Sequence, residues 1–106
     1  MNYTLDGVPY YLLMKKKFGA NKQNSIELRD RDFQHYCMAS TIVDVILYND
    51  EVAILESKPG LMQSLIDFKL IQPPHRTVNS WEKTFPVCRL NYVYEAGWRK
   101  DISSDD

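Results

Sequence analysis

The sequence predicts a small α+β domain with a mainly antiparallel sheet of four to five strands and two helices packed on one face. Two observations lead to this fold class. The chain has 106 residues, which is enough for one hydrophobic core and too few for two. Segments rich in β-branched residues alternate with turn signals and with two helical patterns. We expect residues 1–100 to form this single domain and residues 101–106 to be a disordered acidic tail.

The first element is a hairpin. The dipeptide Asp-Gly at residues 6–7 favours a tight turn between strands at residues 3–5 and 8–13. Pro9 has no N–H to give to a strand ladder. The hairpin should therefore lie at a sheet edge, or residues 9–17 should form a short helix instead.

A strand and a helix are expected next. Residues 25–29 have the composition of a brief strand. Asp30 or Asp32 can accept hydrogen bonds from exposed backbone amides, so either could cap a helix over residues 31–39.

The middle of the chain has the clearest pattern. Residues 42–48 and 52–55 are rich in β-branched residues and flank Asn49 and Asp50, which predicts a second hairpin. A helix should follow, with Ser57 as its N-cap and apolar residues on one side.

The last third begins with an apparent loop. Residues 72–85 contain two consecutive prolines and few apolar residues, so we expect an irregular connection of a length typical of functional loops. Residues 87–94 alternate between apolar and polar side chains, which predicts a strand.

Composition limits the class of function. The net charge is −1, with 13 basic and 14 acidic residues, so the chain lacks the basic excess of a typical polyanion binder. The two cysteines, Cys37 and Cys88, are too few for a disulfide-stapled secreted scaffold, and we expect free thiols. The sequence has no signal-peptide pattern and no membrane-spanning run, so a cytoplasmic location is expected.

One stretch suggests an enzyme. Asp44 lies in the first strand of the second predicted hairpin, and Glu56 and Lys58 follow the second strand ahead of a helix. This arrangement resembles the core of the PD-(D/E)xK nuclease superfamily, over about 20 residues. The resemblance implies that Asp44 and Glu56 would hold Mg²⁺ and that Lys58 would lie beside the attacking water.

The register of that hairpin tests the resemblance, because directly opposed residues of two strands share a face. With a loop of residues 49–50, Asp44 lies opposite Leu55, and Glu56 lies on the other face. With a loop of residues 49–51, Asp44 lies opposite Glu56 and a metal site can form. The two-residue loop fits Asn-Asp better, so we expect no catalytic site and no cofactor, with the Mg²⁺ nuclease as the alternative.

Other ligand sets give weaker signals. The nitrogen and sulfur ligands are His35, Cys37, His75 and Cys88, and their spacing matches no paired zinc motif. Of these, Cys88 with His75 remains open as a nucleophile and base pair.

A basic patch offers a further alternative. Lys15, Lys16 and Lys17 lie near several aromatic residues and could hold phosphates while bases stack beside them. The competing interpretation is that these lysines blunt the edge of a sheet.

The leading hypothesis is a non-enzymatic interaction module that binds a protein, as an inhibitor, adaptor or immunity factor does. Trp81 and Trp98 lie in or beside irregular segments, and tryptophan is frequent among interface anchors. Arg76 and Lys83 would supply charge beside Trp81. A free sheet edge at the first hairpin or at residues 87–94 could also support a homodimer.

Overall fold

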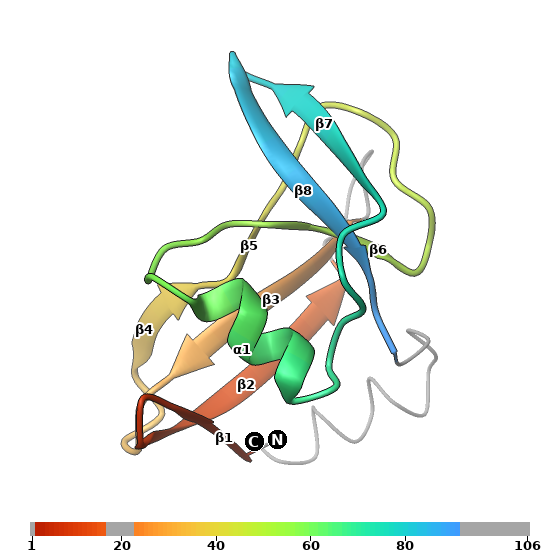
Figure 1. Cartoon of the computed structure of the whole chain (residues 1–106). Coiled ribbons are helices and arrows are strands. Elements are labelled where there is room, and N and C mark those ends of the chain that lie inside the picture. Colours follow the sequence, from red (N-terminus) through yellow and green to blue (C-terminus); the bar gives the residue numbers. More distant parts are fainter. Residues whose placement is uncertain (1, 17–22, 92–106) are drawn as a thin grey trace.

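The computed structural model describes residues 2–16 and 23–91 and shows a mostly β architecture of two antiparallel four-stranded sheets and one short helix (Figure 1). The prediction of a small fold with antiparallel strands is confirmed. The single sheet and the second helix are wrong within the described residues. In that part of the chain, no helix is long and apolar enough to cross a membrane.

The first sheet has the strand order β1-β2-β3-β4. Its strands are β1 (Asn2–Leu5), β2 (Val8–Lys16), β3 (Asn24–Arg29) and β4 (His35–Met38). The opening hairpin is confirmed, because Asp6 and Gly7 have φ angles of 51° and 79° at the turn between β1 and β2. Positive φ at both central residues matches the twist of the flanking strands. Pro9 pairs with Thr4 within the hairpin, so the alternative helix over residues 9–17 is wrong.

The helix expected over residues 31–39 is also wrong, since β4 occupies half of it. The Asp30 side chain accepts hydrogen bonds from the backbone N–H groups of Asp32 and Gln34, both at 2.9 Å. Phe33 then has a φ of 62°, which no helix can continue. The Asp30 side chain therefore closes a turn between β3 and β4, and aspartate is favoured in such turns as it is at a helix N-cap.

The second sheet has the order β5-β6-β8-β7. Its strands are β5 (Ser40–Thr41), β6 (Glu51–Ile54), β7 (Arg76–Ser80) and β8 (Lys83–Arg89). The irregular connection expected over residues 72–85 is wrong, because β7 and β8 form a hairpin there with Trp81 and Glu82 at its turn. The strand expected over residues 87–94 begins earlier, at Lys83, and residues 92–94 lie outside the described part.

The hairpin expected over residues 42–55 does not form. Residues 42–50 contain no strand, and β6 pairs instead with β5 and with β8. Both versions of the expected loop are therefore wrong. Residues 42–50, here called the covering segment, leave β5 and return to β6 by a wide path (Figure 1).

The helix expected after Ser57 is confirmed in place and is shorter than the pattern suggested. The N-cap of helix α1 (Leu61–Asp67) is Gly60, which has a φ of 79°, and not Ser57. Leu61 and Leu65 are fully buried and join the main core. The helix lies across the first sheet (Figure 1).

The two faces of the second sheet contribute to two different hydrophobic clusters. Val52 and Cys88 are a cross-strand pair and belong to the main core, together with the inner residues of the first sheet. Ala53 and Val87, the next pair, point the other way because side chains alternate along a strand. They form a second cluster with Val43 and Val78, here called the outer cluster. The covering segment therefore provides a second, smaller core on the outer face of the second sheet.

Candidate functional site

The covering segment presents two rows of side chains. Val43, Val45 and Leu47 point inward and pack in or against the outer cluster. Asp44, Ile46 and Tyr48 alternate with them and are exposed. Ile46 is 90% exposed and Tyr48 69%, which leaves two large apolar side chains on the surface. The segment thus buries one row and displays the other.

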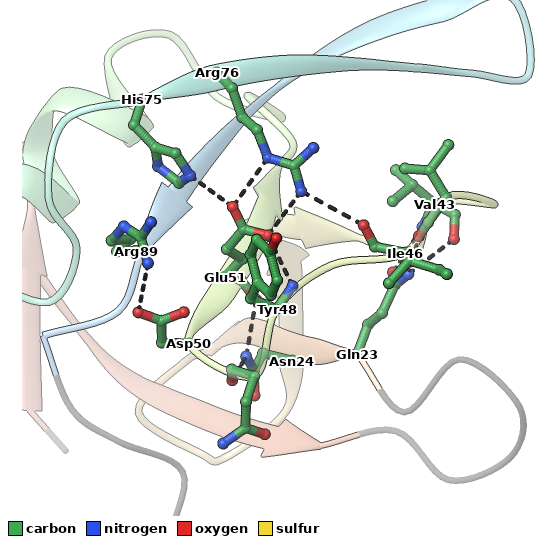
Figure 2. Close-up of polar contacts among 12 residues, drawn as sticks. Gln23, Asn24, Val43, Ile46, Tyr48, Asp50, Glu51, His75, Arg76 and Arg89 are labelled. Carbon is green, nitrogen blue, oxygen red and sulfur yellow. Dashed lines mark hydrogen bonds and ion pairs between the residues drawn. The ribbon is translucent and has the colours of Figure 1, made fainter.

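Glu51 holds the end of this segment in place. Its side chain is completely buried, and one carboxylate oxygen accepts a hydrogen bond from the Tyr48 backbone N–H at 2.8 Å. The Arg76 guanidinium donates to both carboxylate oxygens, at 2.7 and 3.0 Å, and His75 Nε2 lies 2.6 Å from one of them (Figure 2). Arg76 also donates to the Ile46 carbonyl oxygen at 3.4 Å. The group links β6, the covering segment and β7.

The electrostatics of Glu51 follow from these contacts. Hydrogen bonds from Arg76 lower the pKa of the Glu51 carboxyl from 4.5 to about 2, against the opposing effect of burial. The Tyr48 N–H and His75 act in the same direction as Arg76. The carboxylate therefore stays ionised at neutral pH, with its oxygens already engaged.

Two buried amide side chains hold the covering segment on its other side, from Gln23 just before β3 and from Asn24 at its start. Gln23 accepts from the Val43 N–H at 2.9 Å and donates to the carbonyls of Val43 and Val45 at 3.0 and 2.9 Å. Asn24 donates to the carbonyls of Asn49 and Glu51 at 2.9 and 2.8 Å (Figure 2). These contacts satisfy backbone groups that have no partner strand.

The far end of the covering segment is attached to the β7–β8 hairpin. The Ser80 hydroxyl donates to the Asp44 carboxylate at 2.6 Å and accepts from the Asp44 backbone N–H at 3.0 Å. Ser80 is the last residue of β7 and precedes the turn. The exposed row of the covering segment therefore runs along the hairpin toward its tip.

The hairpin tip has an unusual turn. Trp81 and Glu82 have φ angles of 51° and 64°, a conformation that normally selects Asn or Gly at both positions. The Trp81 side chain is 58% exposed. The pairing of β8 with β6 begins at Val87, and Pro86 before it has no N–H to extend that ladder toward the turn. The hairpin therefore projects beyond the rest of the sheet, with Trp81 at its end (Figure 1).

The residues of the nuclease resemblance are not brought together. Asp44 lies in the covering segment on the outer face of the second sheet, whereas Glu56 follows β6 on the way to α1. Asp44 contacts Ser80, whereas Glu56 accepts a hydrogen bond from the Met62 N–H at 2.6 Å, at the start of α1. The Lys58 ammonium lies over the Tyr36 ring, 5.0 Å from its centroid. Within the described residues, no group of three or more His, Cys, Asp and Glu side chains could hold a metal ion.

The surroundings of Cys88 and His75 do not suit a catalytic nucleophile and its base. Cys88 is fully buried, and burial raises the pKa of its thiol to about 11. His75 contacts Glu51, and His35 lies 2.6 Å from Glu27 on the first sheet. Cys37 is buried, and both cysteines are free. A buried thiol with a raised pKa forms little of the reactive thiolate.

The remaining predicted site residues divide into three groups. Trp81 and Lys83 are exposed at the hairpin, and Arg76 forms an ion pair with Glu51. Lys15 is exposed at the end of β2, and Lys16 ends that strand. The residues at positions 17 and 98, Lys17 and Trp98, lie outside the described part of the chain.

Sequence reasoning missed three residues that hold the covering segment, namely Gln23, Asn24 and Glu51. The local sequence predicts only a turn at Glu51, because nothing near it in the sequence shows that it is buried. The pattern around Ile46 and Tyr48 predicts a strand, since an extended segment that covers a sheet has the same alternation as a strand.

Comparison with known proteins gives no assignment, since no family model, curated protein or solved structure matches the chain.

Proposed function

We propose that this protein is a non-enzymatic module that binds another protein through the outer side of its second sheet. The binding surface consists of the hairpin tip and the exposed row of the covering segment, with Trp81, Ile46 and Tyr48 as its apolar contacts. The observation that carries the proposal is the exposed Trp81 at the end of a projecting hairpin.

The exposure of these side chains supports binding. Six large apolar residues are exposed in the described part of the chain, and three of them belong to this surface. Tryptophan and tyrosine are enriched at the centres of protein interfaces, because they bury a large area with few rotatable bonds. Lys83 adds a charge beside Trp81 at the rim.

The rigidity of the surface supports binding as well. Both ends of the covering segment are attached by hydrogen bonds, at Asp44 to Ser80 and at Tyr48 to Glu51. A surface held in one conformation loses little entropy when a partner docks. The cluster around Glu51 thus acts on binding by positioning the exposed row.

The turn at Trp81 is a third argument. A non-glycine residue in the left-handed region costs stability, and two such residues in succession at a hairpin turn cost more. Local strain of this kind is concentrated at functional sites. Here the strain lies at the hairpin turn, where the Trp81 side chain is exposed.

The proposal is tested by capture of partners from cells with a photoreactive residue in place of Lys83, which is exposed beside Trp81. Wild-type protein should compete for the crosslinked partner, and the variants Trp81→Ala and Ile46→Ser should compete at least about tenfold less well. Val8→Ala is the matched control, because Val8 is an exposed apolar residue on the first sheet. Equal competition by Trp81→Ala and wild type would contradict the proposal.

A further inference from the structure

The outer edge of β7 has backbone groups without partners in the described part of the chain. In a hairpin with a two-residue turn, the residues beside the turn form a hydrogen-bonded pair, and bonded and non-bonded pairs then alternate. Ser80 pairs with Lys83, so residues 76, 78 and 80 direct their backbone groups toward β8. Thr77 and Asn79 direct theirs outward. No backbone hydrogen bond reaches these two groups from any other described residue.

Apart from the charge of Arg76, this edge lacks the features that usually protect a sheet edge. Residues 76–80 contain no lysine, no proline and no bulge, and their pairing with β8 is continuous. The edge of β4 differs, because the Met38 carbonyl there accepts a hydrogen bond from the Ser57 hydroxyl at 2.6 Å. β5 has only two residues.

We infer that β7 pairs with β7 of a second copy of this chain, antiparallel about a two-fold axis at Val78. Thr77 would then form a hydrogen-bonded pair with the partner's Asn79, and Asn79 with the partner's Thr77. This is the register that joins the free groups of both edges at once. The inference rests on the proposed function, because a second copy paired along β7 would also cover Trp81 at the hairpin tip of the proposed binding surface.

Charge complementarity favours the second copy as the occupant. In this register Arg76 lies opposite the partner's Ser80, whose counterpart in the structure holds the Asp44 carboxylate. Arg76 uses Nε and Nη2 for its bonds to Glu51 and Ile46, and its side chain is 37% exposed. Its Nη1 group would therefore face the end of the partner's β7 that holds the exposed Asp44, and the dimer would contain two such contacts. A parallel pairing would place like charges side by side.

The apolar surface is consistent with the same arrangement. In this register Trp81 lies opposite the partner's His75. Arg76 is the next residue at that end of β7, and its side chain donates a hydrogen bond to the Ile46 carbonyl. An exposed indole would then be covered by the second copy. A five-residue strand is a small interface, so the dimer should exchange with monomer.

Sedimentation velocity over a concentration series from micromolar to millimolar tests this inference. Wild type should shift with concentration from the 12.4 kDa monomer to twice that mass. Thr77→Pro removes one outward N–H and should weaken dimerisation at least about tenfold, whereas Thr77→Val keeps the N–H and should dimerise as wild type. A circular dichroism spectrum like that of wild type shows that the Thr77→Pro protein is folded.

The register has its own test. A mixture of Thr77→Cys and Asn79→Cys chains should form a mixed disulfide faster than either variant alone, because a hydrogen-bonded pair has the Cα separation that a disulfide needs. Wild type that remains monomeric at every concentration overturns the inference. If a different protein is still crosslinked from position 83 in that case, the proposed function stands and the second copy alone is rejected.

Discussion

Glu51 and Arg76 form an ion pair across the outer face of the second sheet, with two hydrogen bonds of 2.7 and 3.0 Å between them. The sheet order puts β8 between the strands that carry them, so the pair bridges over a whole strand. The carboxylate also holds the Tyr48 N–H of the covering segment. One buried acid thus attaches the exposed row to the hairpin that carries Trp81.

Removal of the Glu51 carboxylate should be strongly destabilising. We expect Glu51→Ala to lower the free energy of unfolding by about 3 kcal/mol, because it leaves the Tyr48 N–H and part of Arg76 without an acceptor. Glu51→Gln keeps one oxygen acceptor and should cost less. Urea denaturation measures both, with the exposed Glu82→Ala as control. A loss below about 1 kcal/mol in Glu51→Ala would show that the pair contributes little.

Stability should fall in acid because of the same carboxyl. Its pKa is about 2 in the folded protein and 4.5 in its ordinary state, so protons bind the unfolded chain first as the pH falls. The contribution of Glu51 is complete above about pH 5.5 and should decrease by about 2 to 3 kcal/mol as the pH drops to 2. Urea midpoints of wild type and Glu51→Gln should converge over this range, and a constant difference would contradict the assignment.

Glu27 contributes a smaller change in the same pH range. Burial acts to raise the pKa of its carboxyl, but hydrogen bonds from His35 and Arg29 lower it overall. This acid dependence should remain in the Glu51→Gln protein, so Glu51→Gln should flatten the acid limb of the stability curve without abolishing it.

Gln23 should control the opening of the covering segment. Gln23→Ala leaves the Val43 N–H and two carbonyls without partners under the segment, and we expect a loss of about 2 kcal/mol. The amide of Val43 should exchange with solvent faster in this variant, whereas amides of β2 and β3 should change little. The exposed Gln34→Ala is the matched control. Unchanged exchange at Val43 would contradict the role of Gln23.

The turn offers a test that separates stability from binding. Glu82→Gly and Trp81→Asn should each raise the free energy of unfolding by about 1 kcal/mol, because Gly and Asn adopt positive φ more readily. Trp81→Asn should lose partner binding, while Glu82→Gly should keep it. Thermal unfolding and crosslink competition measure the two effects. A Trp81→Asn protein that is less stable than wild type would show that the indole packs on the fold.

Local chemistry explains the elements that sequence reasoning predicted. The Asp-Gly turn at residues 6–7 sets the first hairpin through two positive φ angles, which these residues adopt at low cost. The helix over Leu61–Asp67 follows from the spacing of its buried leucines. Both signals lie within a few residues of the structure they specify. Both elements can therefore be predicted without knowledge of the rest of the chain.

The errors share a physical origin. Asp30 can cap a helix or close a turn, and the choice depends on whether residues 35–38 have a neighbouring strand to pair with. Residues 42–48 alternate as a strand does, yet their backbone groups bond to the side chains of Gln23, Ser80 and Arg76. Propensity within a short window is the same in both outcomes.

The order of residues was therefore sufficient for a mostly antiparallel domain, its first hairpin, its one described helix and an apolar strand near residue 87. Long-range contacts selected the rest. Glu51 is buried because Arg76, 25 residues away, supplies its counter-charge, and Asp44 lies at the hairpin tip because Ser80, 36 residues away, binds it. An acid is stable in a protein interior only when such partners are present, and their arrival depends on the complete fold.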